Sequence, residues 1–281
     1  EGALRQLGRW VPRSRLGFLL GAVWELLVQA GHTIFPSRLG RRRPEGSEID
    51  FLAARLYSRL AYVFWFSRGR IPCAWTHLRG MNLMERYPPS VELAQAWSEH
   101  APVMTMIPWY KRGVAYAKKS YEVRESLGDE WGQGQSLSFY GVVLYAASRY
   151  RACISACQGA VDLLSRMGDR WEENTASWHI AFSHYRLGEL SDAVEMARRV
   201  HARATSIGDQ TSRGIALSAW SRASQGNIPE EVIAAELVLG TDDVQTAVEV
   251  RLAEAVRLIG EEDWTGSCRV LDEASALVRS S

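Results

Sequence analysis

The chain has 281 residues, of which 47% are hydrophobic and 23% charged, and its formal net charge is +1. This composition fits a globular protein that buries a core, and the near-zero charge gives no overall reason to expect a nucleic-acid or membrane partner. Four cysteines without clustered spacing favour a reducing, cytoplasmic compartment over a disulfide framework. The first residue is Glu1 rather than Met, so we expect the chain to be part of a longer protein.

The N-terminal segment, residues 1–35, is predicted to be a hydrophobic helical region. Within it, residues 16–35 (LGFLLGAVWELLVQAGHTIF) are about long enough to cross a bilayer. Glu25, Gln29 and His32 interrupt the apolar run, so we expect a helix that is buried or faces a partner. An interfacial helix held by flanking arginines, or a membrane span, remains the alternative for this segment.

Residues 36–46 (PSRLGRRRPEG) are predicted to form a basic linker. Residues 1–45 carry eight Arg against three Glu, hence +5, which leaves −4 of the total of +1 for the remainder. Three adjacent arginines in a linker are usually solvated, and no later helix carries a sustained basic stripe. We therefore expect no nucleic-acid partner.

From residue 47 onward the sequence repeats. Gly-Asp occurs at 128–129, 168–169 and 208–209, forty residues apart each time. Glycine readily takes the left-handed conformation that follows a helix, and Asp is a preferred N-cap of the next helix. Each Gly-Asp pair therefore marks the end of one helix and the start of another.

A second break lies inside each period. The segments SRGR (67–70), IPWY (107–110), ASRY (147–150) and LGEL (187–190) are again forty residues apart and interrupt apolar helical patterns. No segment alternates with the two-residue period of a strand. The sequence therefore predicts an array of helical hairpins, each with a helix A and a helix B.

Small residues recur on one face of the predicted B helices, at spacings of four and three. The three rows are Gly113, Cys153 and Ala193; Ala117, Cys157 and Ala197; and Ser120, Ala160 and Val200. Such a face allows close approach to helix A.

The pattern loosens at both ends of the array, as expected for terminal repeats. QGNI (225–228) and EEDW (261–264) are predicted turns, and Pro229 suits the first turn of a helix. Thr241 is predicted to cap the last A helix, and Pro102 to kink the A helix in which it lies.

This order of small and aromatic positions resembles the tetratricopeptide repeat. The matching residues are Ile180, Ala181, Tyr185, Gly188, Leu190, Ala193 and Val200 in one repeat, and Gly141, Tyr145, Tyr150, Cys153 and Ala160 in the repeat before it. The forty-residue period resembles that of kinesin light chains, maltose-activator-type regulators and segments of large bacterial signalling ATPases. The resemblance implies an all-α, right-handed superhelical α-solenoid of about five to six hairpins over residues 47–281.

Chemical signatures are weak. Cys153 and Cys157 could supply two metal ligands, but small residues occupy the same positions in neighbouring repeats, so packing explains them better. The histidines include no His-Glu-x-x-His pattern, and Gly132 and Gly134 lack the strand and the Lys of a phosphate loop. We therefore predict no enzymatic activity, no metal and no cofactor.

In tetratricopeptide arrays the A helices line the concave groove, so the resemblance implies that some aromatic side chains on these helices face a partner. The alternative is that they fill the core. The predicted groove residues are Tyr62, Trp65, Gln135, Ser138, Tyr145, Trp178, Phe182, Tyr185, Arg213 and Trp220.

The expected function is protein–protein recognition, as a regulatory scaffold beside neighbouring domains of a larger signalling protein. The alternative is a sensor that binds a short peptide or small effector.

Overall fold

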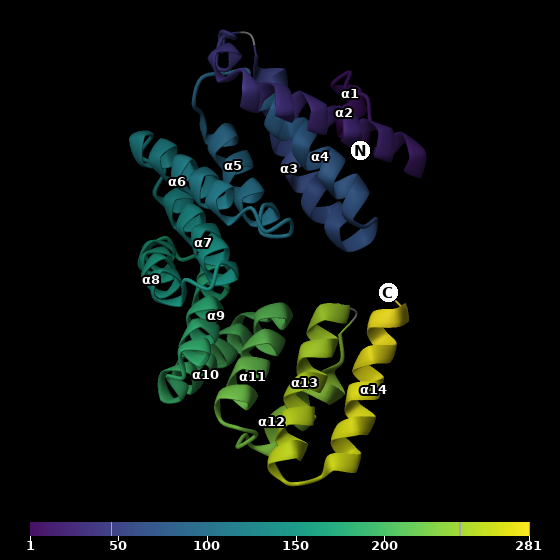
Figure 1. The fold of residues 1–281 in the computed structure, drawn as a ribbon, viewed down its shortest axis with the longest axis vertical. Helices are drawn as coiled ribbons and strands as arrows, with labels where there is room; N and C mark the ends of the chain where they lie inside the picture. Colours follow the sequence, from purple (N-terminus) through teal and green to yellow (C-terminus); the bar gives the residue numbers. More distant parts are fainter. Residues whose placement is uncertain (46, 242, 281) are drawn as a thin grey trace. The chain divides into compact units, whose positions relative to one another are not determined.

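The computed structural model describes residues 1–45, 47–241 and 243–280, and all regular structure within them is helical (Figure 1). Gly46, the last residue of the predicted linker, lies outside the described residues. The helices are α1 (Gly2–Gln6), α2 (Arg15–Ile34), the short 3-10 helix η1 (Pro36–Arg38), α3 (Glu48–Ser67), α4 (Arg70–Met84), α5 (Val91–Val103), α6 (Tyr110–Ser126), α7 (Glu130–Ala146), α8 (Tyr150–Arg166), α9 (Arg170–Leu187), α10 (Leu190–Ile207), α11 (Gln210–Ala223), α12 (Glu230–Leu239), α13 (Val244–Gly260) and α14 (Trp264–Ser280).

The Gly-Asp pairs behave as predicted. Gly128, Gly168 and Gly208 have φ angles of 68°, 76° and 73°. These values lie in the left-handed region, where a helix often ends and which glycine adopts without the steric strain of a side chain. After each glycine, the aspartate Oδ1 accepts a hydrogen bond from the backbone N–H three residues on. These distances are 2.9 Å to Gly132, 3.0 Å to Glu172 and 3.1 Å to Ser212. The periodic signal is thus a stop followed by an N-cap, repeated three times.

The turns inside the repeats also lie where the sequence predicts them. Helices end at Ser67, Ala146 and Leu187, and the next ones begin within a few residues. The exception is Pro102, which produces no kink within a longer helix. It lies one residue before the end of α5, and the chain continues as a loop to α6.

The three predicted rows of small residues are buried without exception. Gly141 of α7 shows why the B helices need them, because a Cβ at this position would collide with the Cys157 sulfur of α8. Cys153 and Cys157 are both fully buried, with their sulfurs 3.9 Å apart. They pack the contact between α7 and α8.

The N-cap of α13, the last A helix, differs from the prediction. Asp243, not Thr241, caps α13: its carboxylate accepts from the Thr246 N–H at 3.0 Å. The Thr241 hydroxyl instead accepts from the Asp243 N–H at 3.1 Å, so it supports the residue that caps. A carboxylate at the N-cap also interacts favourably with the helix dipole, which favours Asp over Thr there.

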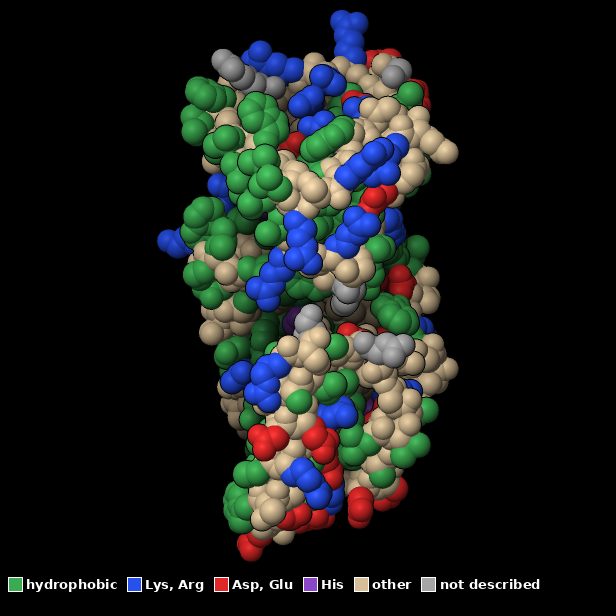
Figure 2. Space-filling view, turned by 90° about the vertical axis from the view of Figure 1, so that its right-hand side faces the viewer, with side chains coloured by type: hydrophobic (Ala, Val, Ile, Leu, Met, Phe, Trp, Pro, Cys, Tyr) green, Lys and Arg blue, Asp and Glu red, His purple; other side chains and the backbone are tan. Residues whose placement is uncertain are grey.

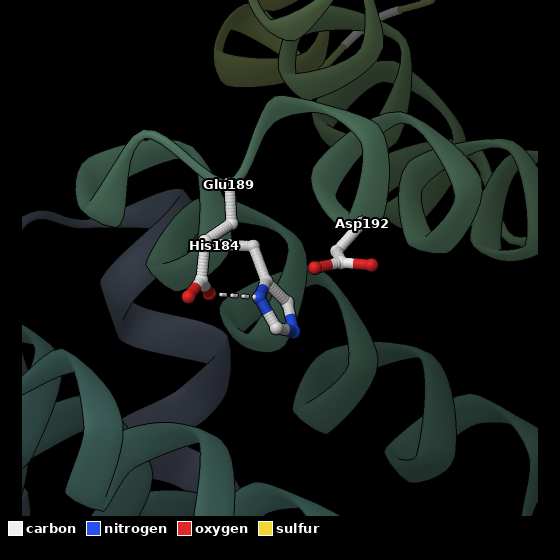
Figure 3. A group of neighbouring side chains, drawn as sticks. All are labelled: His184, Glu189 and Asp192. Carbon is white, nitrogen blue, oxygen red and sulfur yellow. Dashed lines mark hydrogen bonds and ion pairs between the residues drawn. The ribbon is translucent and has the colours of Figure 1, made fainter.

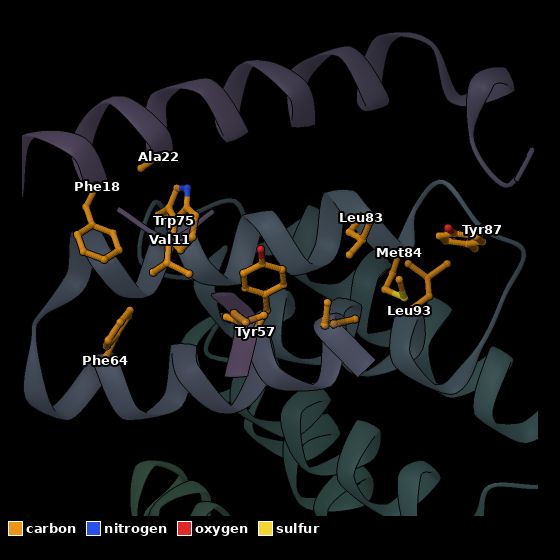
Figure 4. Close-up of a cluster of buried hydrophobic side chains, with 13 residues drawn as sticks. Val11, Phe18, Ala22, Tyr57, Phe64, Trp75, Leu83, Met84, Tyr87 and Leu93 are labelled. Atoms are coloured by element: carbon orange, nitrogen blue, oxygen red, sulfur yellow. The ribbon is translucent and has the colours of Figure 1, made fainter. Parts of the chain in front are cut away.

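The contacts divide the chain into two compact units, residues 1–136 and 137–281, and each is described by itself. In the first unit, the N-terminal segment shares one apolar core with α3, α4 and α5 (Figure 4). Trp75 is the centre of this core, with its ring 6.0 Å from Trp10, 5.5 Å from Phe18 and 6.0 Å from Tyr57. Residues 1–35 therefore fold onto the first hairpin.

In the second unit α8 to α11 pack in chain order, α13 packs on α11, and α12 and α14 pack on α13. One of the unit's apolar clusters joins α11, α12 and α13 through Leu217, Ile233 and Val250. As for membrane contact, none of the helices described here combines the length and the apolarity needed to cross a bilayer.

Candidate binding groove

The first unit contains a pocket of about 260 Å³ on the A helices α3 and α5. We call it the α3–α5 pocket. Its lining residues are Ala54, Arg55, Ser58, Arg59, His77, Gly80, Met81, Met84, Val91, Glu92, Gln95, Ala96, Glu99 and Trp131. It thus draws on α3, α5 and the first turn of α7, with α4 behind them. These are successive A helices, which the resemblance to tetratricopeptide arrays implies as the lining of a groove.

The floor of the pocket is apolar and adaptable. Met81 and Met84 of α4 are both 0% exposed. Methionine has an unbranched, polarisable side chain that fits partners of varied shape. Gly80 keeps α4 close to α3, because a Cβ there would lie 3.0 Å from Cβ of Tyr57. The pocket can therefore receive one aliphatic or aromatic side chain against methionine.

The rim of the pocket carries charge of both signs, and most of it is paired. Arg55 donates to Glu92 Oε1 from Nε at 2.9 Å and from its terminal nitrogen at 2.6 Å. The Ser58 hydroxyl donates to Glu99 Oε1 at 2.6 Å. Arg59 is exposed and makes no ion pair with the residues that the structure describes. The charge left available to a ligand is therefore positive.

A chain of polar contacts runs beneath the rim. Gln95 donates to Glu99 at 2.8 Å and accepts from Arg124, which also donates to Gln135 at 3.3 Å. Arg124 is 0% exposed, and a Cβ at Gly132 would collide with its guanidinium. Gly132, which faintly resembled part of a phosphate loop, thus provides space for a buried arginine.

Two stacked histidines lie at the back of the pocket. His77 Nε2 and His100 Nδ1 are 3.0 Å apart, and His77 Nδ1 is 3.9 Å from Glu99. Burial lowers the pKa of both imidazoles, that of His100 to about 2, where His77 and Arg112 add to the effect. Both rings are therefore neutral near pH 7 and supply hydrogen bonds rather than a positive charge.

Tyr62 and Trp65 extend this surface along α3. They are 64% and 44% exposed, and Tyr62 lies seven residues after Arg55, on the same face of the helix. By contrast, Gln135 and Ser138 of α7 are buried, and Gln135 holds Arg124. Of the four predicted residues in the first unit and at its boundary, Tyr62, Trp65, Gln135 and Ser138, the structure thus places the two aromatic ones at the surface.

In the second unit the structure brings three predicted aromatic residues together. The Tyr145 ring is 6.5 Å from that of Phe182, and the Phe182 ring is 6.4 Å from that of Trp178. Trp178 also stacks on the buried His179, with 3.6 Å between ring centroids. All three aromatic side chains are half-buried, as is Tyr185. We call Tyr145, Trp178 and Phe182 the α7–α9 aromatic cluster.

The two remaining predicted residues face α12 and α10. Arg213 pairs with Glu236 of α12 at 2.7 Å, and Glu236 also contacts His201 at 3.2 Å. Trp220 lines a second pocket, of about 830 Å³, where the Arg198 guanidinium lies 5.2 Å from its ring centroid. No pattern in the sequence indicated this pocket, which forms beside the short helix α12.

One group of potential metal ligands occurs among the described residues: His184, Glu189 and Asp192 (Figure 3). His184 Nδ1 lies 2.7 Å from Glu189 Oε2, and Arg151 pairs with the other carboxylate oxygen. These contacts, that of His184 foremost, lower the pKa of the Glu189 carboxyl. Because both Glu189 oxygens have partners, the arrangement is that of an ion-paired turn between α9 and α10.

The comparisons with known proteins bear on the fold. No family model and no curated protein matches the chain. A solved structure of a signal transduction ATPase with numerous domains from Pyrococcus horikoshii, which carries a tetratricopeptide repeat sensor, is similar with a TM-score of 0.55 and 17% identity. The match covers 92% of this chain and 41% of that protein, so this chain spans about two-fifths of its length.

A second similar structure is aspartyl phosphate phosphatase F from Bacillus subtilis. Its TM-score is 0.58 at 14% identity, over 97% of this chain and 77% of that protein. Together with the helical hairpins, these similarities establish a tetratricopeptide-like α-solenoid fold, as the forty-residue period predicts.

Proposed function

We propose that this chain is a non-catalytic recognition module that binds a segment of a protein partner through the α3–α5 pocket. The observation that carries the proposal is the combination of a buried methionine floor with a rim on which the exposed Arg59 has no ion-pair partner among the described residues. The floor suits one apolar side chain, and Arg59 suits a neighbouring carboxylate. The expected ligand is therefore a short segment with an aliphatic or aromatic residue next to an acidic one.

Within a larger protein, such a module would act as a cytoplasmic regulatory scaffold. The Pyrococcus neighbour is described as carrying its repeats as a sensor of a signalling ATPase, and the same use here would couple ligand binding to neighbouring domains. The second candidate is a sensor for a small effector, which the size of the pocket favours: about 260 Å³ holds one side chain or one small molecule. The α7–α9 aromatic cluster is a further candidate contact surface in the second unit.

The test is a peptide-display selection on the purified chain, followed by affinity measurements on the selected peptides. We expect Arg59→Ala to weaken binding roughly tenfold, the effect of losing one charged anchor. Arg166→Ala is the matched control, since Arg166 is exposed on α8, in the second unit. Peptides bound equally well by the wild type and by Arg59→Ala would exclude the α3–α5 pocket as the site.

The aromatic cluster is tested with Trp178→Ala on the same peptides. A contact residue would lose affinity by about 2 kcal/mol with little change in melting, whereas a core residue would cost about 3–5 kcal/mol of folding stability. Because Trp178 is half-buried rather than enclosed, we expect the first result. A collapse of the melting temperature would assign Trp178 to the core.

A further inference from the structure

Helix α2 is apolar on the side that faces away from its unit. Its buried side consists of Phe18, Ala22, Glu25 and Gln29. Glu25 pairs with Arg79 at 2.9 Å and accepts from Asn82 at 2.8 Å, and Gln29 donates to Tyr116 at 3.2 Å. Glu25 and Gln29, the polar residues in the middle of this helix, thus point inward and are used within the unit.

The outer side carries a continuous seam with the spacing of a coiled coil. Its residues are Leu16, Leu20, Val23, Leu27, Ala30 and Ile34, separated by four, three, four, three and four positions. Ala30 is exposed, and the other five side chains are 64%, 62%, 48%, 62% and 67% exposed. We call these residues the α2 outer seam. In Figure 2, hydrophobic side chains gather at the height that α1 to α4 occupy in Figure 1.

The flanks of the seam are apolar as well. Leu19, Trp24 and Leu26 are 44%, 62% and 56% exposed. Together with the seam they expose roughly 1,000 Å² of apolar surface, above the about 300–600 Å² of the largest patch on a typical monomer. A standard interface needs about 800 Å² from each partner. The outward face of α2 is thus the apolar stripe that a helix normally buries, and it exposes enough area for a stable dimer.

We propose that α2 pairs antiparallel with α2 of a second copy of this chain. The spacing of the seam reads the same in both directions, so a two-fold axis places Leu16 opposite Ile34, Leu20 opposite Ala30 and Val23 opposite Leu27 of the second copy. Such self-complementarity is what an isologous interface requires, and the alternation of three and four residues is what knobs-into-holes packing requires.

The flanks and the charges fit the same arrangement. Trp24 and Leu26 lie on opposite edges of the seam, next to the axis, and each meets its own counterpart in the second copy. The seam contains no charged residue, so no like charges oppose each other. Arg15, exposed at the start of α2, comes to the C-terminal end of the opposing helix, where the helix dipole favours a cation.

The inward orientation of the polar residues argues against a lipid surface as the occupant. An interfacial helix keeps a charged face toward water beside its apolar face. In α2 the polar residues Glu25 and Gln29 face the protein, and the opposite face is wholly apolar.

The test is the oligomeric state of the purified chain by sedimentation equilibrium. We expect a dimer for the wild type and a dissociation constant raised by a factor of roughly ten or more in Leu27→Glu, because a carboxylate enters the apolar seam. Val238→Glu is the matched control: Val238 is 87% exposed on α12, outside the seam, and this variant should remain dimeric. Circular dichroism checks that each variant keeps its helices.

The register is tested by mixing. Val23→Lys alone should also weaken the dimer, whereas an equimolar mixture of Leu27→Glu and Val23→Lys should form a mixed dimer, since the two positions face each other. A wild-type chain that stays monomeric at high micromolar concentration overturns the proposal, whether or not it binds vesicles of anionic lipid. So does a dimer that Leu27→Glu leaves intact, or a mixture that fails to pair.

Discussion

At the scale of single residues, the buried histidines make the stability of this protein depend on pH. Burial lowers the pKa of His77 and brings the pKa values of His100 and His179 to about 2 and about 4. An exposed histidine in the unfolded chain has a pKa of about 6.5. Below that pH the unfolded state binds more protons than the folded state, so stability is complete above about pH 6.5 and falls as the pH decreases.

We therefore predict that the free energy of unfolding falls between pH 7 and pH 5, by up to about 1.4 kcal/mol per pH unit for each such histidine. The groups facing the His77–His100 pair are Glu99, Arg112 and Tyr116. Urea denaturation at several pH values measures the effect. His100→Gln removes one titrating group, so the slope of the unfolding free energy against pH should fall by the contribution of about one bound proton. An unchanged slope in this variant would show that His100 does not contribute.

At the scale of helices, close packing rather than chemistry explains the residues that first attracted attention. Gly141 and Cys157 are the clearest pair, because glycine on α7 is needed opposite a sulfur on α8. The same holds for Gly132, which adjoins Arg124. Each glycine lies where a side chain from a neighbouring helix fills the space of its missing Cβ, Cys157 of α8 for Gly141 and Arg124 of α6 for Gly132.

The contact between α7 and α8 can be tested with one destabilising substitution and a second one that restores stability. Gly141→Ala should destabilise the protein by about 1–3 kcal/mol through overpacking against the Cys157 sulfur. Adding Cys157→Ala removes that sulfur and should restore most of the loss. Thermal melting of the two variants and of Cys157→Ala alone completes the cycle. Equal destabilisation in the single and double variants would mean that another contact limits the approach of α7 and α8.

At the scale of the whole molecule, the chain consists of two contact units, each stabilised mainly by packing between successive helices. In such arrays a repeat is stabilised by its immediate neighbours, and a local defect has local consequences. Leu217 and Trp75, which are 0% and 1% exposed, belong to the cores of the second and first units respectively.

We predict that Leu217→Ala, which should cost about 2–5 kcal/mol, accelerates amide hydrogen exchange in α11 to α13 and leaves α2 to α4 unchanged. Trp75→Ala should accelerate amide hydrogen exchange in α2 to α4 and leave α11 to α13 unchanged. Hydrogen-exchange mass spectrometry of both variants reads out each helix separately. Faster exchange throughout the chain in either variant would indicate that the two units unfold as one cooperative body.

The sequence by itself determined the repeat, its helix boundaries and the rows of small residues. These features are local: a left-handed glycine, an N-cap aspartate and a face of small side chains depend on residues a few positions apart. Local signals could not separate Asp243 from Thr241 as the cap of α13, since both residue types are suitable.

Only the tertiary structure decided which side chains reach the surface. Ser138 and Trp178 occupy the same place in successive repeats, yet Ser138 is buried and Trp178 is half-exposed, because different neighbouring helices cover them. The α3–α5 pocket joins α3, α4 and α5 with Trp131, residues up to 77 positions apart. The outward direction of the α2 outer seam was likewise decided by the pairing of Glu25 with Arg79. Periodicity fixes which residues share a helix face, but only packing between helices fixes which face is covered.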